Sequence, residues 1–393
     1  MADDGIQKEK IALALSGGGS RAMAFHLGCL RALNQLGILQ RIEIISAVSG
    51  GSVIASMYCT LDGDFEDFEA EARKVLAQGF AKPAIKKAFT SLEGLRTLAC
   101  FMVLLCASTV GYLRRLFRWG LSFLGFRHSP RKFTLRRFAS RTTILRAVFS
   151  DLFRHKRLAE LRDDRPKLIV VACELRSKSA FYFAKDVMGS WRLGKSPAGN
   201  TEVAHAVAAS AAYPGFLPAL DEDLELEKDG RRKSERLILT DGGVYDNLGL
   251  APLWPDRDKA ISLHADKYDI MIACRAGYAA ELSPAPRFWS TRMLAVIDVI
   301  HGRVQNASMG RLFDLKKAGV IRGFIIPYLG QADKNLAFPP PDLVTGESVS
   351  NYPTDFSAMS EEWIDRLSKR GEQLTLATLQ EHLPHLLQTE GGI

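Results

Sequence analysis

The sequence predicts an α/β protein in which a mainly parallel central sheet lies between two layers of helices. Two observations carry this prediction. Residues 11–15 and 42–48 are short, mainly apolar runs, which are typical of strands buried on both faces. Each run leads through a turn rich in small residues into a segment of helical character, and alternating strands and helices are typical of parallel sheets.

The predicted elements follow one another in this alternating order. The first helix has apolar residues at helical spacing from Met23 to Leu33 and ends at Gly37, and the second runs from about Gly50 to Thr60. Further strands are predicted at 167–173, 181–183, 236–240, 269–275 and 320–326, and further helices at 203–212 and 360–383.

Residues 76–157 interrupt this pattern and predict a helical insertion within a single domain that spans residues 1–393. The net charge of +8 arises here, because Gly94–Ser150 contains eleven arginines and lysines but no aspartate or glutamate. Thr97–Leu113 is 17 residues without a charge, which is at the short end for a membrane span.

An amphipathic helix is predicted at 112–127, directly after the uncharged run. Arg114, Arg115 and Arg118 share one face of it, while Phe117 lies on the apolar face with Trp119 beside it. Arginines interleaved with apolar residues favour an anionic membrane surface over nucleic acid as the partner. Shallow burial in the interface is favoured over spanning because the uncharged run is short.

The six cysteines lie mostly within apolar runs and lack the paired spacing of a metal site, and no signal peptide precedes Ile11. Reduced, buried thiols in a cytoplasmic protein are therefore expected. With the insertion, this predicts a cytoplasmic protein that associates with a membrane, peripherally or integrally, through residues 97–150.

Ser49 stands between a predicted strand and a predicted helix that begins near Gly50. Such a turn holds a serine hydroxyl outside the packed layers, and the small neighbours Ala47 and Gly51 let the strand and the helix approach closely. The helix N-terminus offers free N–H groups to a developing oxyanion. The alternative is an ordinary strand-to-helix turn with an exposed serine.

Gly17, Gly18 and Gly19 follow the first strand and open the first helix, where successive N–H groups can bind an anion. Together with Ala22 they also fit a loose dinucleotide-binding fingerprint. That site needs an acidic residue at the end of the second strand, whereas Glu43 lies near its beginning. Dinucleotide binding is therefore the weaker alternative.

Asp241 follows the predicted strand 236–240 and precedes two glycines. The carboxyl ends of parallel strands share one edge of a sheet, so the glycine run, Ser49 and Asp241 are expected to converge there. Oxyanion donors, a nucleophile and a base are the groups that acyl transfer needs.

Four motifs occur in a fixed order along the chain. They are Ser-Gly-Gly-Gly-Ser-Arg at 16–21, Val-Ser-Gly-Gly-Ser at 48–52, Ala-Ala-Ser-Ala-Ala-Tyr-Pro-Gly at 208–215 and Asp-Gly-Gly-Val-Tyr-Asp-Asn at 241–247. Together they resemble the patatin-like phospholipase family. The resemblance covers residues 8–62 and 165–275, extends more loosely to 352–356 and the helix after it, and leaves the insertion uncovered.

The resemblance implies a three-layer patatin-like fold and a lipid acyl hydrolase of the phospholipase A or lysophospholipase type. Its substrate would be a membrane phospholipid or a related lipid ester, and no metal or organic cofactor is implied. It implies a Ser-Asp dyad, with Ser49 as nucleophile and Asp241 as base. The glycine run 17–19 would form the oxyanion hole, with Arg21 at the basic position of the family.

Two positions depart from the family pattern, since Ala22 and Ala47 each replace a glycine and add one methyl group at a close packing contact. A Ser-His-Asp triad is the alternative to the dyad. The histidines that follow Asp241 are His264, His301, His382 and His385, and none stands beside a clear strand end. A membrane-bound scaffold with a decayed site is a further alternative, against which the intact Ser49 and Asp241 argue.

Overall fold

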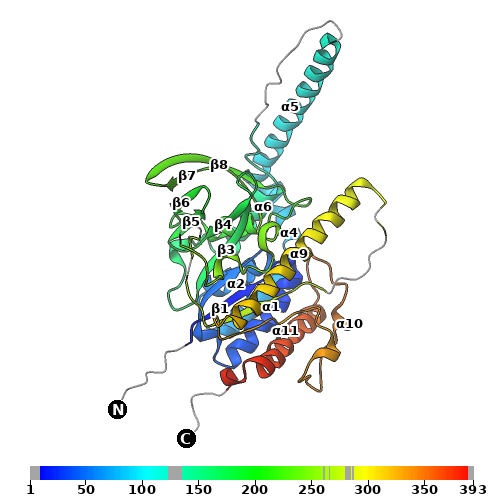
Figure 1. Cartoon of the computed structure of the whole chain (residues 1–393). Helices are drawn as coiled ribbons and strands as arrows, with labels where there is room; N and C mark the ends of the chain where they lie inside the picture. Colours follow the sequence, from blue (N-terminus) through cyan, green and yellow to red (C-terminus); the bar gives the residue numbers. More distant parts are fainter. Residues whose placement is uncertain are drawn as a thin grey trace.

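A ten-stranded sheet runs through the molecule with helices on both of its faces (Figure 1). The computed structural model describes residues 9–122, 135–259, 262–264, 266–278, 285 and 287–387, without the side chains of 115, 116, 118–122, 290 and 294. The predicted α/β class with three layers is confirmed.

Half of the sheet is parallel. Its strands lie in the order β10 (Gly323–Ile325), β9 (Ile270–Cys274), β1 (Ile11–Leu15), β2 (Ile42–Ala47) and β3 (Lys167–Glu174). In β1, Ile11, Leu13 and Leu15 pack into one apolar core, whereas Ala12 and Ala14 pack into the other. This strand is therefore buried on both faces, as its continuous apolar run predicts.

The two cores correspond to the two helical layers. One layer contains α1 (Gly19–Gln35), α2 (Gly50–Thr60), α3 (Phe65–Gln78), α7 (Val203–Ser210) and α11 (Glu361–His382). The other contains α8 (Gly243–Asp246) and α9 (Trp289–Lys317), a long helix that the sequence analysis did not predict. The described residues also form a short helix, α10 (Gly346–Val349). They contain five 3-10 turns, at Leu39–Arg41, Leu158–Glu160, Ala251–Leu253, Asp333–Asn335 and Pro384–Leu387.

The other half of the sheet is antiparallel, so the prediction of a mainly parallel sheet is wrong there. Its strands are β4 (Ser179–Phe183), β5 (Val187–Ser190), β6 (Gly194–Pro197), β7 (Leu220–Lys228) and β8 (Arg231–Asp241), and β8 returns to pair with β3. Among the described residues, six strand pairs are antiparallel and four are parallel, which reverses the predicted balance.

The segment 76–157 contains α4 (Ala81–Thr90), α5 (Leu92–Ser122) and α6 (Arg141–Leu152). α6 belongs to the body of the protein, because Leu145 and Phe149 are buried in the core. α5 projects from the body (Figure 1). Its stretch Leu92–Arg114 is 23 residues with a mean hydropathy of 1.6 and 11% burial, long and apolar enough to cross a membrane by length and composition alone.

Helices α1 and α11 cross in direct backbone contact. A Cβ atom placed on Gly28 would lie 1.7 Å from Ser368 O, and one placed on Gly371 would lie 2.1 Å from Phe25 O. No side chain fits between the two helices at this point, so each of the two glycines is required for the crossing distance.

We expect Gly28→Ala to destabilise the protein by about 3 kcal/mol, because the added methyl group meets backbone that cannot move without separating the two helices. Chemical denaturation measures the effect. Gly310→Ala, in α9 with no atom within 4 Å of the new Cβ, is the matched control. It should gain up to about 1 kcal/mol from helix propensity. Equal stability of the two variants would contradict the described crossing.

Candidate active site

Two strands of opposite direction meet end to end on one edge of β3. Ala47 at the end of β2 pairs with Val170, and Asp241 at the end of β8 pairs with Ala172. The carboxyl ends of β2 and β8 therefore meet beside Val171, and the turn that carries Ser49 lies next to Asp241. The sequence analysis expected this convergence from a shared edge of parallel strands, and that reason is wrong because β8 is antiparallel to β3.

Ser49 occupies a strained turn between β2 and α2. Its backbone has φ 51° and ψ −122°, a region that residues with a side chain rarely adopt. The Ser49 N–H donates to Ser210 Oγ at 2.9 Å, and Ser210 Oγ donates to Val171 O at 2.6 Å. The α7 serine thus holds the turn in place, and the Ser49 side chain stays 7% exposed.

The glycine loop packs directly against this turn. A Cβ on Gly17 would lie 3.2 Å from Ser49 Cβ, and a Cβ on Gly50 would lie 2.1 Å from Gly19 O. Gly19 itself has φ 59°. Backbone therefore meets backbone where the loop before α1 and the start of α2 touch, which explains why glycines occupy both sides of this contact.

Gly17 N–H donates to Asn247 O at 3.1 Å, so this residue of the glycine run is not a free donor. Three other backbone N–H groups beside Ser49 have no acceptor among the described residues. Within the described part of the chain, no group accepts a hydrogen bond from the N–H of Gly18, Gly19 or Gly50. Gly19 and Gly50 are also the first residues of α1 and α2, so the positive ends of two helix dipoles point here. The arrangement favours a negative charge next to the Ser49 hydroxyl.

Asp241 is 2% exposed, and its Oδ1 accepts a hydrogen bond of 2.7 Å from Gly243 N. Oδ2 has no hydrogen-bond partner among the described residues. Burial raises the pKa of Asp241 to about 7, against the opposing effects of the Gly243 N–H and the Ser49 side chain. A carboxylate with this pKa and a free oxygen can accept a proton near neutral pH.

Arg21 lies beneath the glycine loop and bonds to protein backbone. Its Nε donates to Ala276 O at 3.0 Å and its Nη1 to Tyr352 O at 3.2 Å, while the guanidinium stacks 4.4 Å from the centre of the Tyr278 ring. These contacts tie the loop after β9 to the segment before α11. A contact of Arg21 with substrate stays a prediction.

Two residues of the site have positioning contacts that the sequence analysis did not assign. Ser210 bridges the Ser49 turn to β3, and the Asn247 side chain lies between the glycine loop and the Asp241 turn. A Cβ on Gly17 would lie 2.4 Å from Asn247 Oδ1, and one on Gly243 would lie 2.7 Å from it. Both residues stand inside motifs quoted above, which was the available signal.

None of the described histidines forms a hydrogen bond with Ser49 or Asp241. His264 packs edge-on against Tyr182 at 5.8 Å, and burial lowers its pKa to about 4. Burial also lowers the pKa of His301 in α9, while His385 lies 3.3 Å from Glu9. The geometry offers no histidine partner for a Ser-His-Asp triad in the part of the chain described.

Fold and site together define an α/β protein in which a serine occupies a strained turn between a strand and a helix, the geometry expected of a nucleophile elbow. The sequence model described as patatin-like phospholipase matches residues 13–254, more than half of the chain, and the chain belongs to the patatin-like phospholipase family. The family resemblance of the four motifs is thereby confirmed. No curated protein matches the chain by sequence.

Solved structures of human GIVD cytosolic phospholipase A2 share the fold. One gives a TM-score of 0.56 at 14% identity, covering 99% of this chain and 64% of that protein. A second, in complex with the inhibitor methyl γ-linolenyl fluorophosphonate and terbium chloride, gives 0.51 at 14% identity, covering 99% and 60%. VipD from Legionella pneumophila gives 0.38 at 13% identity, covering 95% and 67%. The chain thus spans less than two thirds of the human protein.

The raised pKa of Asp241 predicts a specific pH dependence of stability. The unfolded carboxyl loses its proton near pH 4, whereas the folded one retains it up to about pH 7. Stability should therefore fall as the pH rises through this window, by up to about 4 kcal/mol. Asp241→Asn removes this titration, so its stability relative to wild type should increase from pH 5 to pH 8.

Chemical denaturation of wild type and Asp241→Asn at several pH values measures the difference between their free energies of unfolding. This difference removes the contributions of all other titrating groups, because they are the same in both proteins. A difference that stays constant between pH 5 and pH 8 would mean that Asp241 titrates like an exposed carboxyl.

Proposed function

We propose that the protein is a lipid acyl hydrolase that cleaves carboxylic esters through a Ser49–Asp241 dyad. The observation that carries the proposal is the meeting of two strand ends, which brings a strained serine next to a buried carboxylate with a free oxygen. Family membership supports a lipid ester as the substrate.

In the proposed reaction, Ser49 Oγ attacks the ester carbonyl while Asp241 accepts the hydroxyl proton. The oxyanion accepts hydrogen bonds from the free N–H groups of Gly18, Gly19 and Gly50. Collapse of the tetrahedral intermediate releases the alcohol, which takes the proton from Asp241. Water then attacks the acyl-enzyme with Asp241 again as base, and the fatty acid leaves as Asp241 returns the proton to Ser49 Oγ.

We expect Ser49→Ala and Asp241→Asn each to lower ester hydrolysis by about a thousandfold or more, and the double variant to be no worse, because the two groups act as a unit. Turnover of a soluble ester and labelling by a fluorophosphonate probe measure the loss. Replacement of His264, His301, His382 or His385 by glutamine should leave most of the activity.

If a histidine variant were as inactive as Asp241→Asn, the Ser-Asp dyad would be wrong and a Ser-His-Asp triad would take its place. A folded wild-type protein that neither reacts with the probe nor hydrolyses esters would favour the decayed scaffold instead. Binding of a nicotinamide dinucleotide by such a protein would favour the dinucleotide reading of the glycine loop.

We further propose that the substrate lies in an anionic membrane surface, which α5 contacts from the cytoplasm in a peripheral manner. Leu98 and Phe101 are each 59% exposed and Phe117 is 69% exposed, so the helix presents apolar side chains that the body does not cover. Arg114 is exposed as well. The predicted membrane contacts of Arg115, Arg118 and Trp119 concern side chains outside the described residues.

Charge and apolar burial can be separated by two sets of substitutions in α5. Replacing Arg114, Arg115 and Arg118 by glutamate should weaken binding to anionic vesicles by about a hundredfold or more, at about 1 kcal/mol for each arginine. Replacing Leu98, Phe101 and Leu105 by serine should weaken the binding that remains at high salt. Vesicle sedimentation measures both.

A matched control is the exposed basic run Arg231, Arg232 and Lys233 in the β7–β8 hairpin, whose replacement by glutamate should change vesicle binding little. Hydrolysis of a short soluble ester should be unaffected in all three variants. Full vesicle binding by both α5 variants would show that another surface contacts the membrane.

A further inference from the structure

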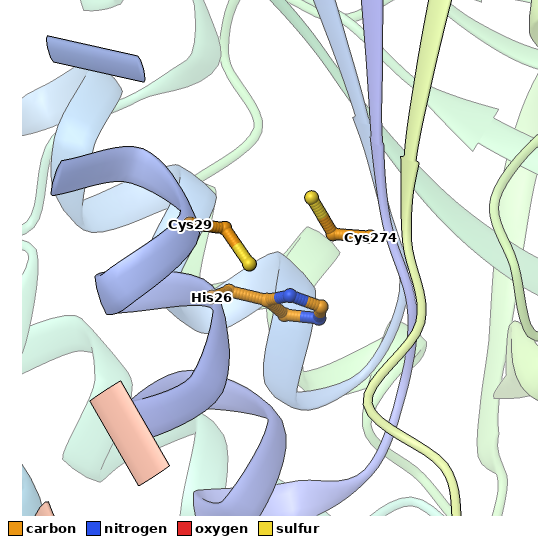
Figure 2. A group of neighbouring side chains, drawn as sticks. All are labelled: His26, Cys29 and Cys274. Atoms are coloured by element: carbon orange, nitrogen blue, oxygen red, sulfur yellow. The ribbon is translucent and has the colours of Figure 1, made fainter. Parts of the chain in front are cut away.

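Three side chains with metal-ligating atoms meet directly behind the glycine loop. His26 and Cys29 extend from α1, and Cys274 is the last residue of β9; all three are 0% exposed. Figure 2 shows them pointing into the same space between the helix and the sheet. Their ligand atoms all lie within 4.8 Å of one another.

The hydrogen bonding of His26 leaves one ring nitrogen without a partner. Nε2 lies 2.9 Å from Ser16 O, and only a protonated nitrogen can donate to a carbonyl oxygen, so Nε2 carries the proton of the neutral ring. Nδ1 then has a free lone pair, yet it is buried and has no partner among the described residues. A buried polar atom without a partner needs an explanation, and a bound ion or water molecule is one.

A ring bonded through one nitrogen to a backbone carbonyl, with the other nitrogen free, is how proteins orient a histidine that binds a metal ion. Two thiols beside it complete a set of soft donors that suits zinc and related ions. Zinc–sulfur bonds are about 2.3 Å and zinc–nitrogen bonds about 2.0 Å. Ligand atoms around a tetrahedral zinc ion lie less than about 4 Å apart, so binding would require the three side chains to close in from separations of up to 4.8 Å.

We propose that His26 Nδ1, Cys29 Sγ and Cys274 Sγ form a binding site for one thiolate-preferring transition-metal ion of the zinc class. The sequence analysis missed this site because the two cysteines are 245 positions apart and show no paired spacing. Only the alignment of β9 with β1 brings Cys274 to α1.

The site would brace the residue that opens the glycine loop. Ser16 N–H donates to Cys274 O at 3.1 Å, and Ser16 O accepts from His26 Nε2. An ion held by His26 and Cys274 thus fixes the partners of both backbone groups of Ser16. The consequence for catalysis rests on the proposed function, whereas the binding itself does not.

The test uses the reduced full-length protein after treatment with a chelator, titrated with Co²⁺ and with Zn²⁺. We expect one ion per chain, thiolate-to-cobalt charge-transfer absorption and a higher Tm with Zn²⁺. Cys29→Ser and Cys274→Ser should each abolish the charge-transfer band or shift it strongly.

The control is Cys59→Ser, in which a buried thiol of α2 that lies outside the cluster is replaced; it should bind cobalt like wild type. Absence of the band in wild type, or an unchanged band in the Cys29 and Cys274 variants, would overturn the proposal. So would a Cys29–Cys274 disulfide in a protein that binds no metal ion. If a serine variant does not fold, the presence or absence of the cobalt charge-transfer band in wild type still decides.

Cobalt binding by a protein that hydrolyses no ester would leave this site intact and refute the proposed function. Ester hydrolysis without metal binding would do the reverse, so the two failures are distinguishable.

Discussion

The position of the candidate site depends on how β2 and β8 share one edge of β3. β2 uses the first part of this edge and β8, running the opposite way, uses the second. Neither strand can extend without displacing the other, so both must turn out of the sheet at Val171. A Cβ on Gly242 would lie 2.2 Å from Val171 O, which leaves glycine as the residue that fits after Asp241. Steric exclusion between two strand ends thus brings the serine and the carboxylate together.

The strands and turns in the parallel half of the sheet were predictable from the sequence, because their local residue patterns match the burial that the sheet imposes on them. Strand β1, the glycine run, the elbow strand and α7 each carry a short-range signal that the buried sheet then uses. β7 was missed although its acidic residues alternate with Leu224 and Leu226, which is the pattern of a half-buried strand. The Asp229-Gly230 turn, with φ 51° and 73°, is a strong hairpin signal that marks its end.

The residues of the candidate site could be named from the sequence, but their arrangement in space could not. Motifs indicated Ser49, Asp241 and the glycines, but periodicity does not encode that β8 returns antiparallel to β3. Ser210 and Asn247 stand inside quoted motifs, but their roles depend on contacts between segments far apart in the chain, which the motifs do not specify. The cluster of His26, Cys29 and Cys274 has the same origin, because it depends on the register of β9 against β1.

The close crossing of α1 and α11 at Gly28 and Gly371 bears on where the folding unit ends. The family match stops at residue 254, yet α11 lies against the helix that begins at the glycine loop. β9, which flanks β1, also lies beyond that limit. A folding unit that ended with the matched region would lack β9 and α11, the elements that pack around the glycine loop. We therefore expect the chain from β1 to α11 to unfold as one cooperative unit, in which α11 supports the candidate site although none of the residues proposed to react lies on it.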